Sequence, residues 1–329
     1  MRTRSLPLIA AFLVARAAVA SEPPSPLTVP DLVGPRTLAL QAGVGSASGN
    51  EAMFLNPAAI AARKRYTVDT FYLTDRRPDL GPPGQSDLRR QDYLGFTVAD
   101  SATTAVAAGL SYVRVLQGVN TGNLVRLALA APLGRGIFLG AQGNYFDLQG
   151  SNPVASTLNM DGGLYWQVTS MVSIGGAAYN FIFTHDREVL PRGYAAGFTV
   201  GSETSLQVVA DWHLDLDRVK DANGNSKSSN RYTVGAEYLL ANSVPVRAGF
   251  GVDDISGFMC SGASASQSAC QPPAGSSAAP AVTANTRWWS AGLGFVSTRF
   301  AFDAGFRQST TDPSARTFAV AARVFVPSE

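Results

Sequence analysis

The stretch SLQVVADWHLD at residues 205–215 decides the fold, because apolar and polar side chains alternate along it at almost every position. One face would carry only apolar residues, namely Leu206, Val208, Ala210, Trp212 and Leu214. The opposite face would be polar or charged, with Val209 as the exception. Successive side chains of a β-strand point to opposite faces, so a period of two predicts a strand.

The same alternation recurs along the chain from residue 64 onward. Fourteen segments show it, at residues 64–75, 91–100, 104–115, 122–132, 136–147, 156–168, 171–183, 190–201, 204–215, 230–240, 244–253, 286–297, 299–309 and 316–327. Strands of about ten residues are typical of barrels that cross a membrane, whereas strands in soluble sandwiches average about 5–6 residues.

The connections between these segments alternate in length. Long polar connections follow the odd-numbered segments, at 76–90, 116–121, 148–155, 184–189, 216–229, 254–285 and 310–315. Even-numbered segments end in tight links such as Gly134-Arg135 and Thr169-Ser170. Outer-membrane barrels have short periplasmic turns and longer outer loops. The sequence therefore predicts an all-β protein, a transmembrane antiparallel β-barrel of about 14 strands with the long connections outside the cell.

Composition excludes several other classes of protein. The 329 residues are 46% apolar and 15% charged, which is too little charge for a disordered chain or a coiled coil. The chain has 26 basic and 24 acidic residues, and three of the basic ones lie before residue 21. The remainder is close to neutral, so we expect no nucleic-acid partner.

The N-terminus has the pattern of an export signal. Arg2 and Arg4 precede an apolar run from Leu6 to Val14, and Ala18-Val19-Ala20 is a small-x-small cleavage pattern. A membrane anchor would need about 20 apolar residues. We expect a signal peptide over residues 1–20, cleaved after Ala20, and a mature protein in the bacterial outer membrane.

Residues 21–63 do not alternate and are longer than a linker requires. They contain the small-residue run LALQAGVGSA at 38–47 and the motif EAMFLNPAAIA at 51–61. This arrangement, placed between a signal and fourteen strands, resembles the start of the FadL/TodX-like family of outer-membrane transport proteins and their PorV-like relatives. Leu55 stands where the family motif has tyrosine, and Ala59 where it has glycine.

The resemblance implies that residues 21–63 fold back into a barrel formed by residues 64–329 and act as an N-terminal hatch. It places Asn56, Pro57 and Ala58 at the junction between hatch and first strand. The residues suit a turn, because Pro57 moves Asn56 out of the helical region and Asn56 can bond nearby backbone groups. The alternative is an ordinary turn before a strand. Connections 148–155 and 184–189 are short for loops that capture lipids, so fatty-acid specificity does not follow.

The inward face of the strands carries the charges. We expect the polar lining of the lumen to include Asp69, Arg126, Asp161, Asp211, His213, Arg231, Glu237, Arg247, Asp303, Arg307 and Arg323. The same charges facing lipid would cost about 2–4 kcal/mol near the middle of the membrane. Their mixed signs fit either a network that holds the hatch or a weakly selective polar path.

Few residues suggest catalysis or a metal site. The chain has two histidines, His185 and His213, and no G-x-S-x-G motif accompanies them. His213 beside Asp211 and Asp215 could form a catalytic arrangement, but a polar lumen lining accounts for it more simply. The oxygen-rich stretch 215–225 lacks the spacing of an EF-hand and fits an Asn-Gly turn better. We expect no enzyme activity, no cofactor and no metal.

Cys260 and Cys270 are the only cysteines, and both lie in the longest connection. Outside the cell two thiols oxidise readily, so we expect a disulfide there. A metal site or two free thiols are the alternatives.

Three functions fit this sequence to different degrees. The leading one is passive passage of small hydrophobic molecules, which makes such a molecule and the membrane lipids the expected partners. The second is a PorV-like accessory barrel that binds a secreted protein or an export machine. An outer-membrane hydrolase is the third, and it lacks a nucleophile motif.

Overall fold

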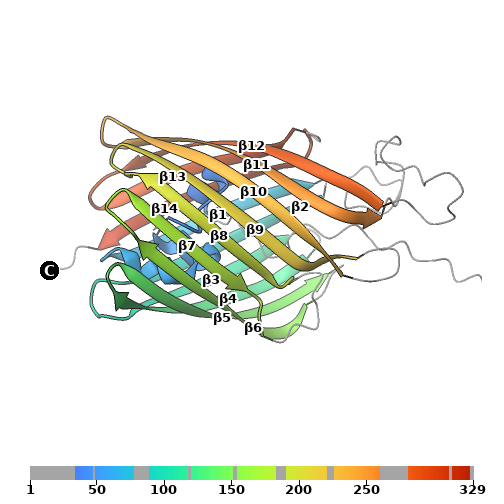
Figure 1. The fold of residues 1–329 in the computed structure, drawn as a ribbon, viewed down its shortest axis with the longest axis horizontal. Coiled ribbons are helices and arrows are strands. Elements are labelled where there is room, and N and C mark those ends of the chain that lie inside the picture. The colour runs from blue at the N-terminus through green and yellow to red at the C-terminus, as the bar shows by residue number, and fades with distance from the viewer. Residues whose placement is uncertain are drawn as a thin grey trace, which may run out of the picture.

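The computed structural model describes residues 34–46, 49–77, 89–117, 120–150, 154–182, 190–220, 226–259, 281–310 and 313–326. Within these residues, fourteen antiparallel strands close into one barrel (Figure 1). Each strand pairs with its neighbours in sequence, and β1 pairs with β14 to close the ring. The fold class and the number of strands predicted from the alternation are confirmed. The expected signal peptide and the cysteine pair lie outside the described residues.

The strands are β1 (Tyr66–Arg77), β2 (Arg89–Asp100), β3 (Ala107–Gln117), β4 (Asn120–Gly134), β5 (Ile137–Gly150), β6 (Val154–Gln167), β7 (Val172–Tyr179), β8 (Gly193–Gly201), β9 (Leu206–Lys220), β10 (Ser226–Leu240), β11 (Val244–Met259), β12 (Ala281–Val296), β13 (Phe300–Ser309) and β14 (Arg316–Val326). Every predicted segment overlaps one of them.

Several strands, such as β9 and β11, extend beyond their predicted segments, and at two other predicted boundaries side chains fix the end of the strand. The segment expected from 104 begins at Ala107, since the Asp100 carboxylate accepts hydrogen bonds from the backbone amides of Ala102 and Thr103 and bends the chain. The segment expected to reach 183 ends at Tyr179. Asn180 adopts a left-handed φ of 52°, and its amide side chain bonds Asn159 and the Pro191 carbonyl instead of continuing the ladder.

The two faces of the sheet separate as the alternation requires. In β9, Leu206 and Trp212 are 51% and 37% exposed, whereas Val209 and Asp211 on the other face are 1% and 5% exposed. The outward face is apolar on every side of the barrel, as lipid demands. No helix in the described ranges is long and apolar enough to cross a membrane.

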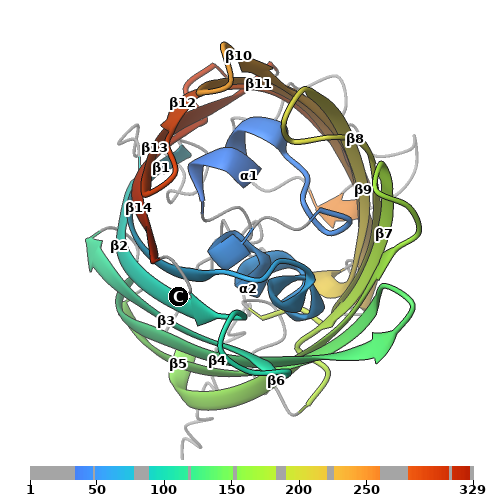
Figure 2. The same ribbon diagram turned by 90° about the vertical axis from the view of Figure 1, so that its left-hand side faces the viewer.

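Four short helical elements precede the barrel: α1 (Pro35–Leu40), η1 (Gly49–Glu51), α2 (Ala52–Leu55) and η2 (Pro57–Ala62). They lie inside the ring of strands, toward the end that carries the short turns and the C-terminus (Figure 2). Almost all of their side chains are buried. The N-terminal segment is therefore a hatch within the barrel, and "hatch" below means residues 34–46 and 49–65.

Candidate functional site

The hatch backbone lies directly against a belt of glycines on the inner wall. A Cβ built on any of these glycines would sit between 1.9 and 2.9 Å from a hatch atom. The belt consists of Gly140, Gly163, Gly175, Gly197, Gly235, Gly249, Gly292 and Gly305. It runs from β5 to β13, so only residues without a side chain leave enough room for the hatch over most of the circumference. Sequence reasoning missed this belt, although its signal is glycine at inward positions of the strands.

Asn56 joins three parts of the molecule. Its side-chain oxygen accepts a hydrogen bond from the Ala58 amide at 3.2 Å and caps η2, which begins at Pro57. Its Nδ2 donates to the Val44 carbonyl at 2.9 Å and to the Leu164 carbonyl of β6 at 3.0 Å. Of the three residues that the resemblance placed at the junction with the first strand, Asn56 lies between α2 and η2, and Pro57 and Ala58 begin η2. They lie within the hatch and before β1, which begins at Tyr66, and Asn56 ties the hatch to itself and to the wall.

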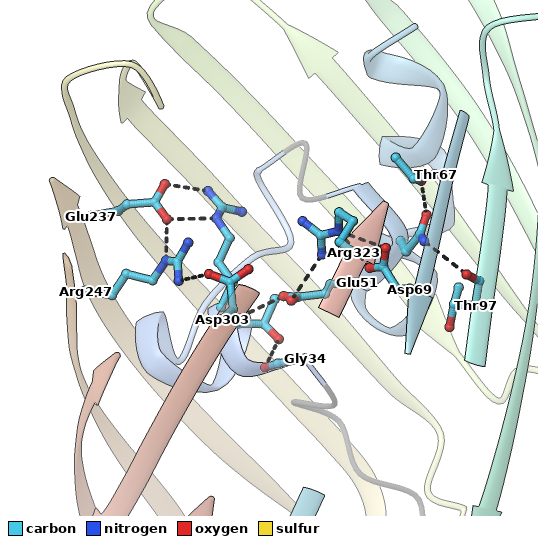
Figure 3. A network of polar contacts seen from close by, with 12 residues as sticks. Gly34, Glu51, Thr67, Asp69, Thr97, Glu237, Arg247, Asp303 and Arg323 are labelled. Atoms are coloured by element: carbon cyan, nitrogen blue, oxygen red, sulfur yellow. Dashed lines mark hydrogen bonds and ion pairs between the residues drawn. The ribbon is translucent and has the colours of Figure 1, made fainter. Parts of the chain in front are cut away.

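Ion pairs hold α1 against the opposite side of the lumen (Figure 3). The Arg36 guanidinium donates to both carboxylate oxygens of Glu237 on β10, at 3.0 and 3.1 Å. Arg247 of β11 bridges Glu237 and Asp303 of β13, at 2.5 Å to each. All four side chains are buried. Removing one partner of a buried ion pair typically lowers the free energy of unfolding by about 3–5 kcal/mol, because it leaves a buried charge without a partner.

A second ion cluster crosses the seam where β1 meets β14. Asp69 and Arg323 face each other across the two strands, and the Arg323 Nε lies 2.8 and 2.9 Å from the Asp69 carboxylate oxygens. The hatch joins this pair through Glu51, whose Oε1 lies 3.6 Å from Arg323. The other Glu51 oxygen accepts a hydrogen bond from the Thr37 amide at 2.9 Å.

Burial and charge act differently on the two hatch residues in these clusters. Burial on its own would lower the pKa of Arg36, but the carboxylates of Glu237 and Glu203 outweigh it and raise that pKa above its ordinary value. Burial raises the pKa of Glu51, and Arg323 and Arg36 only partly offset it. Arg36 therefore stays charged at any physiological pH.

Asp211 binds the backbone of the hatch and forms no hydrogen bond to His213. One of its carboxylate oxygens, Oδ2, accepts hydrogen bonds from the amides of Gly43 at 2.6 Å and Val44 at 2.9 Å. The nearest nitrogen of His213, Nε2, is 3.7 Å from that oxygen, beyond hydrogen-bond distance. The His213 ring instead stacks on Tyr179, with ring centroids 6.4 Å apart. The Asp211 carboxylate thus bonds the hatch backbone and does not orient the His213 ring.

The remaining expected lumen residues lie on the inward face as well. Arg126 lies over the Phe54 ring at 4.6 Å and donates to the Met53 carbonyl of the hatch. Asp161 accepts hydrogen bonds from Gln142 and Asn144 on β5. Arg307 lies over the Trp288 ring, 4.7 Å from its centroid. Arg231 is half-buried on β10, opposite His213.

Residues 183–189, 221–225 and 260–280 lie outside the described residues, and with them His185, part of the oxygen-rich stretch and both cysteines. Asp217, which belongs to that stretch, pairs with Arg192 at 2.6 Å. Among the described residues, no three His, Cys, Asp or Glu side chains gather to hold a metal ion.

The half of the lumen toward the long connections has one apolar wall. Two cross-strand rows from β1 to β5 build it, and their side chains are at most 5% exposed. The apolar wall consists of Phe71, Leu73, Tyr93, Val113, Val115, Leu124, Phe146 and Leu148. It packs into one cluster with the hatch residues Met53, Phe54 and Leu55. Sequence reasoning stressed the charges and missed this wall, which shows in the sequence as apolar residues at inward positions.

A polar cavity of about 430 Å³ opens on the other side of the hatch, at the short-turn end. Hatch residues Arg63, Lys64 and Arg65 line it together with the turns that follow β6 and β8. Arg63 pairs there with Glu203 of the β8–β9 turn. The hatch thus lies between the apolar wall on β1–β5 and a polar opening.

Solved structures of similar fold include hydrocarbon channels and toluene transporters. The CymD monoaromatic hydrocarbon channel aligns with a TM-score of 0.57 at 14% identity, over 89% of this chain and 96% of its own. The toluene transporter TbuX of Ralstonia pickettii has a TM-score of 0.54 at 14% identity, over 89% and 97% of the two chains. A FadL homologue of Pseudomonas aeruginosa has a TM-score of 0.55 at 12% identity, again over 89% and 97%.

No protein-family model matches the sequence. No curated protein matches it either. At 12–14% identity the likeness to the solved structures concerns the fold alone. On that evidence, and as the motif around Asn56 predicted, the chain has the hatch-filled barrel fold of the FadL- and TodX-like outer-membrane transport proteins.

Proposed function

We propose that this barrel lies in a bacterial outer membrane, which the export signal predicted from its sequence and its apolar outer face also favour, and that it passes small hydrophobic molecules without covalent chemistry. The apolar wall on β1–β5 carries this proposal. Water-filled barrels have polar interiors, because an apolar lining gains nothing from contact with water. A lining of Leu, Val, Phe and Tyr instead suits an apolar solute. The likeness of fold to hydrocarbon channels supports the same substrate class.

The hatch would make passage selective by blocking a free water path. Its ion pairs and its hydrogen bonds to Asp211 hold it across the lumen, and the glycine belt brings its backbone against the wall from β5 to β13. A solute on the apolar wall would meet Phe54, which contacts Phe71 edge-to-face at 6.1 Å, and would reach the polar cavity only after a local shift of the hatch. Such a shift would let one barrel exclude ions and still admit an apolar solute.

Uptake of labelled toluene by cells tests the proposal. Cells expressing the barrel should take up toluene faster than cells without it, and Leu124→Asn should remove most of the gain because it places a polar amide in the apolar wall. Asn144→Ala is the control, since Asn144 is buried on the inner face of the neighbouring strand β5 but belongs to neither apolar row.

Equal uptake with and without the barrel would contradict passage. If a secreted protein or an export complex then co-purified in stoichiometric amount, the accessory role would replace it.

A further inference from the structure

A row of arginines lies side by side on the outer face of the barrel. Arg316 of β14 is the register partner of Arg76 on β1, and Arg76 is the partner of Arg90 on β2. Their neighbours along the strands on the same face are Tyr72, Thr74 and Phe318, so all three belong to the outward register. Like charges directly opposite each other disfavour a sheet. This row therefore needs negative charge from elsewhere.

Among the described residues, that charge is supplied to only one of the three. Arg90 donates to the Asp92 carboxylate at 2.8 Å and to the Tyr72 hydroxyl at 2.9 Å. Arg76 and Arg316 have no carboxylate and no hydrogen-bond acceptor in the part of the chain that the structure describes. Two guanidinium groups on neighbouring strands thus have no counter-ion among the described residues.

The two arginines head a groove on the outer wall. The groove has a volume of about 280 Å³ and is lined by Thr74, Arg76, Phe306, Arg316 and Phe318. The Thr74 hydroxyl is buried there without a hydrogen-bond partner. Phe306 and Phe318 are register partners on β13 and β14, one step nearer the middle of the barrel than Arg316. The groove combines two cations and a free hydroxyl at one end with two aromatic rings at the other.

The level of the groove along the barrel indicates what fills it. Arg316 is the first residue of β14 and Arg76 lies one residue before the end of β1, both beside the long connections. Below the phenylalanines the outer face continues with apolar residues such as Phe302 and Val320, which are 54% and 37% exposed. The guanidinium group of arginine forms bidentate hydrogen bonds with phosphate oxygens. Charged side chains at the edge of the membrane-spanning band lie at the level of the lipid headgroups.

We infer that this groove binds a lipid whose headgroup carries phosphate, with the phosphate between Arg76 and Arg316 and the Thr74 hydroxyl donating to it. The acyl part lies on Phe306 and Phe318. A free anion would contact only the two arginines. A lipid would also contact the two phenylalanine rings through its acyl chains. The site faces away from the lumen and does not depend on what the barrel transports.

Binding of lipid A to the purified full-length barrel in an uncharged detergent tests the inference by native mass spectrometry. The wild-type protein should retain lipid A, and Arg76→Gln with Arg316→Gln should weaken binding at least tenfold. Arg114→Gln is the matched control, because Arg114 is an outward arginine near the same end that already donates to Asn123. It should bind like the wild type. Phe318→Ala should weaken binding severalfold.

Two further measurements distinguish a lipid site from a site for a free anion. Enzymatically dephosphorylated lipid A should bind the wild-type barrel at least tenfold more weakly, a comparison that needs no variant to fold. Equal binding of the two lipids, or of wild type and double variant, would overturn the inference. So would complete displacement of lipid A by millimolar inorganic phosphate together with no effect of Phe318→Ala, since the site would then hold a free anion.

Discussion

Replacing Gly175 by alanine should loosen the hatch, whereas the same change at the next residue should not. A Cβ on Gly175 would lie 1.9 Å from the Val44 carbonyl oxygen and 2.9 Å from Asn56 Nδ2, although real Cβ contacts are hardly ever under 3.0 Å. Val44 must therefore retreat by about an ångström. Gly176 faces the other way, and its Cβ would meet only the Ala195 carbonyl oxygen at 3.8 Å. Both substitutions add one methyl group to β7, but only the methyl group at residue 175 points toward the hatch.

The retreat has a calculable cost. It stretches the 2.9 Å bond from Asn56 to the Val44 carbonyl and the bond from the Val44 amide to Asp211, in a region where Val44 is fully buried. Overpacking costs about 1–3 kcal/mol, and a buried polar group that loses its partner costs a similar amount. We expect hatch docking to weaken by about 2–4 kcal/mol, which is roughly 30- to 1000-fold in the docking equilibrium.

Hydrogen exchange followed by mass spectrometry measures this effect on peptides from residues 34–62. Their exchange should accelerate by at least roughly 30-fold in Gly175→Ala, in line with that cost, and stay unchanged in Gly176→Ala. Exchange in β1–β5 should stay slow in both proteins, because the ladder is untouched. Equal hatch protection in the two variants would refute the reasoning, since it would mean that the hatch does not rest on this glycine.

Other expectations concern anchoring, orientation and the cysteines. Asp211→Ala should free the hatch by about 2–5 kcal/mol, because two buried amides lose one charged acceptor; Asp211→Asn, which keeps an acceptor, should fall between it and the wild type in the same exchange measurement. A cysteine at Thr104, in a short turn, should react with an impermeant thiol reagent only after the outer membrane is ruptured, and reaction on intact cells would reverse the orientation. Protein isolated without reductant should show no free thiol at Cys260 or Cys270, and Cys260→Ser should leave the melting temperature of the barrel nearly unchanged while speeding proteolysis between 254 and 285.

The strands could be predicted because lipid and lumen impose different chemistry on alternate residues. This demand acts at every position, so it leaves a regular mark in the sequence. Val209 is the one apolar residue on the polar face of the stretch 205–215. It packs on Leu40 and Ala42 of the hatch. The apolar side chain that departs from the alternation is therefore explained by its contact with the hatch.

The site could be predicted only in part, because its contacts join distant residues. The inward register of Glu237 follows from alternation, but its partner Arg36 lies 201 positions away and has no periodic signal. Strand ends were missed for a similar reason, since single side chains such as Asn180 set them. Spacing along the chain determines which face a residue occupies. The residue that meets it across the lumen depends on how the hatch is folded.

The ion pair at the seam has a consequence for the order of assembly. Asp69 and Arg323 are 254 positions apart, and they meet only when the last strand pairs with the first. Glu51 of the hatch joins the same arginine, so its charge finds this partner only at that moment. Bringing together residues so far apart in the sequence costs chain entropy, and this cost is offset only once β14 has paired with β1. Ring closure and the locking of the hatch therefore form one cooperative step, and a chain that has not yet received β14 holds its hatch by the other anchors alone.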